Sequence, residues 1–239
     1  MTLFRALLFN FAFALWTLFL GIVALPLLLA PRRTVMRFGR FWSAGTLLLL
    51  RWCVGLSHEV RGYENLPPGP SLIAMKHQSA WDTLALPVVF EDPAVVLKQE
   101  LMWIPFYGWY AKKAGMVPID RAGGAKALKS MVARSKVILE SGRPVVIFPE
   151  GTRKSVGAPP DYQPGIAALY AQLNAPLVPV AVNSGLFWGR RAFMKRPGRI
   201  VMEILPPIEP GLPRKQVMAE LQARIETVSD RLADKSVDI

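Results

Sequence analysis

One histidine in the sequence is placed where it could act as a base. The stretch MKHQSAWDTL, residues 75–84, holds one of only two histidines in the 239-residue chain, with Asp82 five positions after His77. A carboxylate that accepts from one imidazole nitrogen fixes the tautomer and stabilises the imidazolium, which leaves the other nitrogen to take a proton. The alternative for Asp82 is structural, because an aspartate at the start of the helix expected over DTLALPVVF would cap that helix.

A second stretch has the composition of an anion site. In VVIFPEGTRKS, residues 145–155, an apolar strand runs into Pro149, Glu150, Gly151, Thr152, Arg153 and Lys154. Glycine lets a substrate approach the backbone, a threonine hydroxyl can donate, and the two cations offer phosphate a bidentate fork and a point charge. A charged surface turn is the alternative. We favour an anion site, because the charges are closely bracketed by a strand and a Pro/Gly-rich loop.

Two further stretches carry weaker signals. In AGMVPIDRAGG a short strand ends beside Asp120 and Arg121, which alone is typical of a solvated turn but would place a second arginine at a strand end. Upstream, LMWIPFYGWYAKKAG contributes five aromatic residues among apolar ones. Such a stretch could line a channel for an alkyl chain, but burial in the core is the default expectation.

An α/β domain is expected to position these groups. Beyond residue 57, short β-rich runs alternate with helical patterns, which is typical of a mostly parallel central sheet flanked by helices. The expected strands are 58–62, 71–75, 94–98, 115–119, 144–148, 177–182 and 199–205, and helical spacing predicts helices over 124–141 and 213–233. His77 and Glu150 each follow a strand, and ligands of open α/β sheets bind at strand ends.

Residues 1–56 differ in composition from the rest of the chain and are expected to form membrane-anchoring helices. The α/β domain of residues 57–239 follows them. The apolar segment 3–30 has only Arg5 and Asn10 as strongly polar residues and, at about 1.5 Å per residue, is long enough to cross a bilayer. It runs into PRR rather than a small-residue cleavage site, so a removed signal peptide is disfavoured. The shorter segment 41–56 is expected to be tilted, re-entrant or interfacial, with tryptophans at headgroup level.

The charge distribution supports a membrane surface. The chain has a formal net charge of +12, and residues 1–56 contain arginines but no acidic residue. By the positive-inside tendency, PRRTVMRFGR faces the cytoplasm, which places the catalytic domain on the cytoplasmic side of the inner membrane. No nucleic-acid partner is expected, because no zinc-finger, basic-zipper or RNA-binding signature is found. One cysteine and two distant histidines offer neither a disulfide nor an ordinary metal site, so we expect no metal.

Four stretches, in this order, resemble the glycerolipid acyltransferases of the 1-acylglycerol-3-phosphate acyltransferase type. KHQSAWD supplies a histidine, four intervening residues and an aspartate, and VPIDR, FPEGTR and LVPVAV follow it. The resemblance spans residues 58–185 and implies that His77 is a general base oriented by Asp82. It also implies that the substrate's phosphoglycerol is held by Arg121, Glu150, Gly151, Thr152 and Arg153.

The resemblance implies a reaction as well. A fatty acyl group moves from a thioester co-substrate, acyl-carrier protein or acyl-CoA, to the free hydroxyl of lysophosphatidic acid and gives phosphatidic acid, with no further cofactor. Membrane phospholipids and lysophospholipids are then the lipid partners. The alternatives are another lysolipid acceptor such as a lyso-aminolipid, a membrane-bound thioesterase that uses water, and a non-catalytic lipid-binding protein. The chain has no G-x-S-x-G elbow, which agrees with direct transfer.

One position departs from the resemblance. The family usually has asparagine before the histidine, where this sequence has Lys76. An ammonium close to His77 would weaken the base unless the lysine points at phosphate or is itself neutralised. We therefore place Lys76 with the substrate-binding residues.

Overall fold

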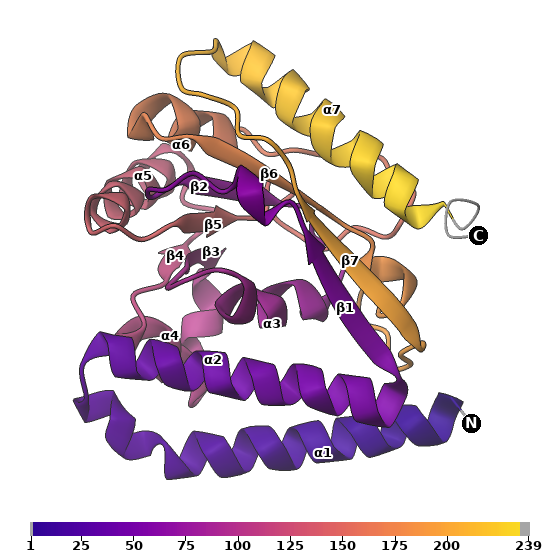
Figure 1. Ribbon diagram of the computed structural model, residues 1–239. Helices are drawn as coiled ribbons and strands as arrows, with labels where there is room; N and C mark the ends of the chain where they lie inside the picture. Colours follow the sequence, from indigo (N-terminus) through magenta and orange to yellow (C-terminus); the bar gives the residue numbers. More distant parts are fainter. Residues whose placement is uncertain (1, 235–239) are drawn as a thin grey trace.

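Seven strands form a sheet with helices on both faces in the computed structural model, which describes residues 2–234 (Figure 1). The strands are β1 (Leu56–Arg61), β2 (Leu72–Met75), β3 (Ala94–Lys98), β4 (Val117–Ile119), β5 (Val145–Ile147), β6 (Leu177–Val182) and β7 (Gly198–Ile204). The α-helices are α1 (Thr2–Val23), α2 (Arg32–Leu49), α3 (Ala80–Val89), α4 (Tyr107–Lys113), α5 (Gly124–Glu140), α6 (Gly165–Leu173) and α7 (Arg214–Ala233). The sheet order is β1-β7-β6-β2-β5-β3-β4, so β2 is central.

Parallel pairing brings the carboxyl ends of the central strands to one edge of the sheet. β2 pairs in parallel with β5 and β6, and β3 pairs in parallel with β5 and β4, whereas β7 runs antiparallel to β6. The central strands are continuous apolar runs, LIAM in β2 and LVPVAV in β6, and every residue of both is buried. Strands covered by helices on both faces have this pattern.

Alternate residues of β2 face two separate parts of the core. Ile73 and Met75 belong to a cluster that includes residues of α1, α2 and α3. Leu72 and Ala74 belong to a second cluster with residues of α5, α6 and α7. Figure 1 shows the same layers, with α6 and α7 on one side of the sheet and α3, then α2 and α1, on the other. Because successive side chains of a strand point to opposite faces, neighbouring residues at the end of β2 meet different surroundings.

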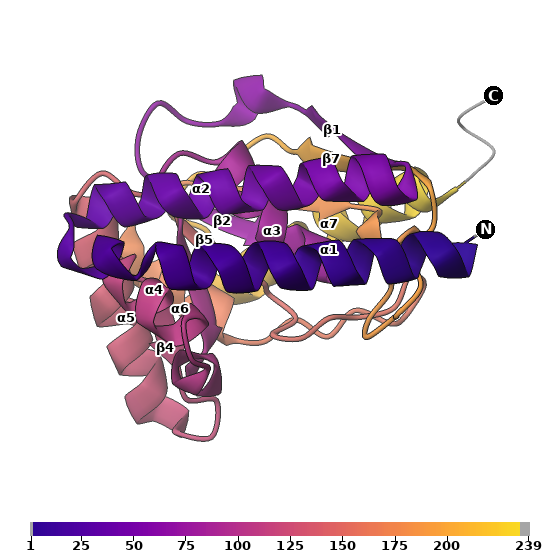
Figure 2. The ribbon, with the colours of Figure 1, turned by 90° about the horizontal axis from the view of Figure 1, so that it is seen from below.

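Helices α1 and α2 lie side by side and antiparallel (Figure 2). The contact is close at Gly45, where a Cβ would come within 2.3 Å of the Trp16 ring. The Trp42 indole donates to Thr17 Oγ1 at 3.1 Å, and Trp16 donates to the Trp42 carbonyl at 3.1 Å. Trp42, expected at headgroup level, is therefore part of the contact between the two helices.

Helix α1 is long and apolar enough over Leu3–Val23 to cross a membrane, judged by length and composition. The apolar segment does not continue as one helix to residue 30, because a short 3-10 helix with Pro26 at its start, Leu25–Leu29, turns the chain towards α2. The segment expected to be interfacial is helical through a π turn that ends at Val54. At the start of α2, two hydrogen bonds of 2.5 and 2.7 Å join Arg32 to Asp92, which precedes β3.

The pattern-based predictions of elements are confirmed with small shifts. All seven expected strands are present, with ends displaced by at most two residues, and the two expected helices are α5 and α7. The expectation of a buried aromatic stretch is wrong, because Trp103, Tyr107 and Trp109 are exposed. This stretch forms short helices near α1 rather than core, and the Tyr110 hydroxyl donates to the Gly21 carbonyl at 3.0 Å.

Candidate active site

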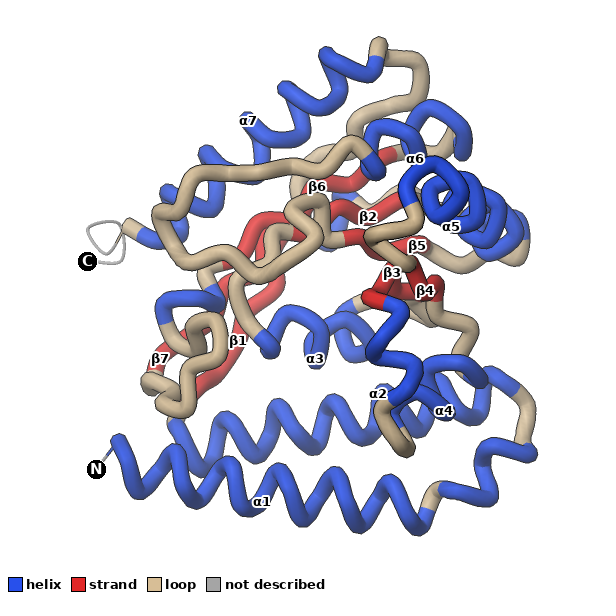
Figure 3. Tube along the Cα trace, turned by 180° about the vertical axis from the view of Figure 1, so that it is seen from behind, coloured by secondary structure: helices blue, strands red, loops and turns tan. Residues whose placement is uncertain are grey.

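Loops that follow three neighbouring strands meet at the carboxyl edge of the sheet. His77 follows β2, residues 148–153 follow β5, and Ser184 follows β6. The connection from β5 to α6 is a long loop (Figure 3). This loop is hydrogen-bonded to the segment that follows β2, because the Lys154 amide donates to the His77 carbonyl at 2.8 Å.

His77 and Asp82 form a buried hydrogen-bonded pair. His77 Nδ1 lies 2.9 Å from Asp82 Oδ2, the histidine is 8% exposed and the aspartate is fully buried. An ionised carboxylate only accepts, so in the neutral imidazole Nδ1 carries the hydrogen and Nε2 keeps its lone pair. Nε2 has no hydrogen-bond partner among residues 2–234, and the ring stacks on Phe148 with centroids 3.9 Å apart. Nε2 is thus available to take a proton from a bound molecule.

Helix capping fixes the turn between these two residues. Ser79 is the N-cap of α3 and accepts from the Trp81 amide at 3.1 Å, while Asp82 Oδ2 accepts from the amides of Gln78 at 2.7 Å and Ser79 at 2.8 Å. This is a capping box in which Asp82 is the third helical residue rather than the cap expected from the sequence. The same carboxylate therefore closes the helix start and holds the histidine.

Ser184, which the sequence reasoning missed, completes the surroundings of Asp82. Its hydroxyl donates to Asp82 Oδ1 at 2.5 Å, and the residue is fully buried. It begins the short 3-10 helix Ser184–Leu186 after β6, the strand beside β2. The only sequence signal was a serine soon after an apolar strand, and its meaning depends on the strand order.

The other residues expected to bind an anion gather around Gly151. This glycine has φ +65°, which disfavours residues with a Cβ, and its amide donates to the Phe148 carbonyl at 2.9 Å. Arg121, from the loop after β4, reaches the same turn, because its guanidinium carbon lies 3.9 Å from where a Cβ on Gly151 would stand. Thr152 and Arg153 follow in the chain and are half-buried. The structure thus brings Arg121 to the turn of residues 151–153.

Lys76 and Glu150 do not join that group. The Lys76 ammonium lies 2.8 Å from Glu150 Oε1 and 2.8 Å from each carboxylate oxygen of Glu226. Lys76 is 3% exposed and Glu150 is 2% exposed. Both side chains lie in this buried cluster, because alternation along β2 turns Lys76 away from His77 and towards two carboxylates. That they bind substrate stays a prediction. Burial raises the pKa of Glu150, although Lys76 opposes the change.

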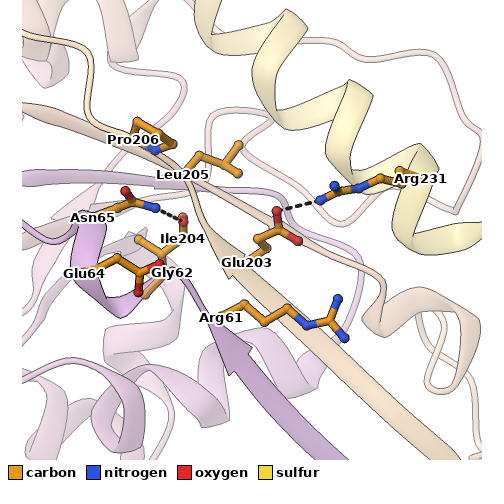
Figure 4. Close-up of a pocket in the computed structure, with 9 residues that line it drawn as sticks. All are labelled: Arg61, Gly62, Glu64, Asn65, Glu203, Ile204, Leu205, Pro206 and Arg231. Carbon is orange, nitrogen blue, oxygen red and sulfur yellow. Dashed lines mark hydrogen bonds and ion pairs between the residues drawn. The ribbon is translucent and has the colours of Figure 1, made fainter.

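The hollow drawn in Figure 4 lies elsewhere, at the ends of β1 and β7, and has a volume of about 340 Å³. Arg231 in it pairs with Glu203 at 2.6 Å, and Asn65 donates to the Ile204 carbonyl at 2.9 Å. β7 runs antiparallel to β6, with Ile204 opposite Val180, and none of the residues that line this hollow belongs to the four stretches singled out in the sequence. The candidate site is therefore the edge that carries His77.

Known proteins resemble this chain in sequence and in fold. The acyltransferase family model matches residues 57–183. A 1-acyl-sn-glycerol-3-phosphate acyltransferase of Pseudomonas aeruginosa is 37% identical over 196 residues, which cover 82% of this chain and 76% of that protein. The 1-acyl-sn-glycerol-3-phosphate acyltransferase alpha of Mus musculus is 31% identical over 199 residues, 81% of this chain and 68% of the mouse protein. The crystal structure of a 1-acyl-sn-glycerophosphate (LPA) acyltransferase of Thermotoga maritima has the same fold, with a TM-score of 0.80 over 98% of this chain and 97% of the other, at 20% identity.

Proposed function

The chain belongs to the acyltransferase family, and from this premise we propose that it transfers a fatty acyl group to the free hydroxyl of lysophosphatidic acid and forms phosphatidic acid. The observation that carries the proposal is the 2.9 Å contact between His77 Nδ1 and Asp82 Oδ2 beside the turn at Gly151. The pair offers a base for an alcohol, and the turn offers an anion site for the phosphate of the same acceptor.

In the proposed reaction, His77 Nε2 removes the proton of the acceptor hydroxyl as its oxygen attacks the carbonyl carbon of an acyl thioester. The carbon–sulfur bond then breaks, and the leaving thiolate receives the proton from the imidazolium. Asp82 stabilises the imidazolium between these steps, and Ser184 holds Asp82 in place. Because a thioester is already activated, deprotonation and alignment suffice without a covalent enzyme intermediate.

The acceptor phosphate is assigned to Arg121 and Arg153, with Gly151 and Thr152 allowing close approach to the backbone. Guanidinium groups bind phosphate through two parallel hydrogen bonds, which also orients the rest of the molecule. The base and the anion site must be close together, because only a glycerol backbone separates phosphate from hydroxyl. The 2.8 Å hydrogen bond from the Lys154 amide to the His77 carbonyl supports that spacing.

Both the acceptor and the product are lipids, which fits the apolar outer side of α1. Its exposed large apolar residues are Leu3, Phe4, Leu7, Leu8, Phe11, Leu15, Leu18, Phe19, Ile22 and Val23. This side would rest on the cytoplasmic leaflet of the inner membrane, where the exposed Arg33, Arg37 and Arg40 of α2 pair with anionic headgroups. The donor would be acyl-carrier protein or acyl-CoA, which reaches the site from the cytoplasm.

A product assay tests the proposal. Purified full-length protein in phospholipid vesicles receives an acyl-labelled thioester with lysophosphatidic acid, with a lyso-aminolipid, or with no acceptor. We expect label in phosphatidic acid, and loss of that product in His77→Ala. Release of free fatty acid without acceptor would identify a thioesterase, and preferential labelling of the aminolipid would identify a different acceptor. Retained lipid binding without any turnover would identify a binding protein.

A further inference from the structure

A buried cluster of charged side chains lies on the sheet face opposite His77. At its centre the Lys76 ammonium contacts Glu150 and both oxygens of Glu226, each at 2.8 Å. The Tyr162 hydroxyl donates to Glu226 Oε1 at 2.8 Å. Burial and the neighbouring carboxylates raise the pKa of Tyr162, so its hydroxyl keeps its proton. The proposed reaction uses none of these four side chains.

The cluster joins segments that are remote in the sequence. Lys76 follows β2, Glu150 follows β5, Tyr162 lies in the loop before α6, and Glu226 belongs to α7. Figure 1 shows α7 lying across one face of the sheet, and Glu226 of this helix contacts Lys76 at 2.8 Å. Glu226 is outside the residues 57–183 matched by the family model. The C-terminal helix therefore adds a carboxylate from outside the matched region.

Glu150 connects the cluster to the active site. Its Oε1 is bound by Lys76, and its Oε2 accepts from the His77 amide at 3.4 Å. The next residue is Gly151, where the proposed phosphate-binding turn begins. A movement of the Glu150 carboxylate would therefore displace both the histidine backbone and that turn. Displacement of about 1 Å can lower an enzymatic rate by about 100-fold.

The carboxylate of Glu226 determines how firmly the Lys76 ammonium is held. Side-chain exposure is 3% for Lys76, 0% for Glu150 and 18% for Glu226, so of the three charged groups Glu226 alone is reached by solvent to a marked extent. An open groove of about 370 Å³ between residues 157–160 and α7 reaches that carboxylate. Removal of one partner from a buried ion pair leaves an uncompensated charge and is strongly unfavourable. Without Glu226, the ammonium would keep Glu150 as its one carboxylate partner among residues 2–234, and it would draw water or shift to compensate.

We propose that Glu226 and Lys76 form a positioning clamp, in which Glu226 holds the Lys76 ammonium against Glu150, and Glu150 in turn fixes the His77 backbone and the turn at Gly151. This inference rests on the proposed function, because it assigns the residues behind that same site. It also explains how a lysine is accommodated directly before the proposed base. The ammonium points to the other sheet face, and two carboxylates neutralise it.

The test compares Glu226→Gln with a matched control on the same helix. Glu220→Gln removes the same charge, but Glu220 pairs with Arg224 and not with Lys76. We measure kcat, the KM for lysophosphatidic acid, the KM for the acyl thioester and the thermal unfolding midpoint of the full chain in vesicles. Glu226→Gln should lower kcat about tenfold and raise the KM for lysophosphatidic acid, with an unchanged thioester KM. Glu220→Gln should stay within about twofold of the wild type, because Glu220 and Arg224 form a partly exposed i,i+4 pair.

A milder variant completes the experiment, and the outcomes below separate failure of the clamp from failure of the proposed function. Tyr162→Phe removes one hydrogen bond to Glu226 and should change kcat in the same direction by about threefold. Wild-type kinetics in Glu226→Gln would overturn the clamp. So would a decrease that only follows the unfolded fraction at the assay temperature, because that marks a structural role alone. Full activity of His77→Ala in the same assay would instead defeat the proposed function, so the two failures are distinguishable.

Discussion

Two adjacent residues at the end of β2 meet opposite surroundings. On the α7 face, Lys76 is enclosed by two carboxylates, whereas on the α3 face His77 is held through Nδ1 and keeps Nε2 unpartnered among the described residues. The difference follows from strand alternation, which sends neighbouring side chains to opposite faces. A fixed positive charge can thus stand one position from a base in sequence while the sheet separates the two side chains.

Removal of the base, on the α3 face of the sheet, should lower kcat more than any other change considered. His77→Ala deletes the proton acceptor, and Asp82→Asn removes the carboxylate that sets its tautomer. Each should lower kcat by about 10² to 10⁴-fold, since that is the contribution of a positioned general base. Single-turnover acyl transfer measures the effect, with circular dichroism as the folding control. Near wild-type turnover in either variant would remove His77 from the chemistry.

Lys195 is a second buried lysine, and unlike Lys76 it has no carboxylate partner in the part of the chain that the structure describes. Among residues 2–234, the partners of the Lys195 ammonium are all neutral: Asn10 Oδ1 at 2.6 Å, the Phe193 carbonyl at 2.9 Å, and the rings of Phe9 and Trp188. Burial lowers the pKa of Lys195 from 10.5 to about 8. Between these values the folded protein binds fewer protons than the unfolded chain, so the free energy of unfolding should rise with pH.

The rise in the free energy of unfolding should be at most about 3.5 kcal/mol, because the two pKa values differ by about 2.5 and each pKa unit corresponds to about 1.4 kcal/mol. The rise should be complete above the pKa of Lys195 in the unfolded chain and absent below its pKa in the folded protein. It should be lost in Lys195→Met. Denaturant titrations below, within and above this pH window measure it. An equal rise in Lys195→Met would assign it to other groups.

Loss of the anion site should weaken binding while leaving the base intact. Arg121→Ala or Arg153→Ala should raise the KM for lysophosphatidic acid about tenfold or more, since hydrogen bonds to charged groups contribute about 1.5 to 3 kcal/mol. Steady-state kinetics with varied acceptor measure this change. The exposed Arg134 of α5 provides the control, because Arg134→Ala removes the same charge from an exposed position of a helix. Equal effects from all three variants would indicate a general electrostatic attraction.

The smallest expected effect concerns the second oxygen of Asp82. Ser184→Ala removes the donor to Oδ1 and leaves that buried oxygen without it. We expect kcat to fall about fivefold, corresponding to roughly 1 kcal/mol for one hydrogen bond. The KM for lysophosphatidic acid should stay unchanged, which separates this variant from the arginine variants. A change confined to KM would mean that Ser184 contacts the acceptor instead.

The sequence predicts local features of the molecule well and long-range ones poorly. Apolar runs bounded by Pro and Gly identify the strands, and the clusters at their ends bring together His77, Asp82, Arg121 and Gly151. The contacts of Lys76 could not be predicted, because its partner Glu226 lies 150 positions away, on a helix whose placement no local pattern reveals. Ser184 was missed for a related reason, since its contact with Asp82 depends on β6 lying beside β2.

The most direct test of the account is a structure of the full chain with a lysophosphatidic acid analogue and a non-transferable acyl thioester analogue. We expect the free hydroxyl oxygen of the acceptor at about 3 Å from His77 Nε2, within hydrogen-bond reach of a base. Its phosphate should contact Arg121 and Arg153, with Lys76 still bound to Glu150 and Glu226. A phosphate bound by Lys76, or an acceptor hydroxyl out of reach of Nε2, would contradict the assignment of the two faces of β2.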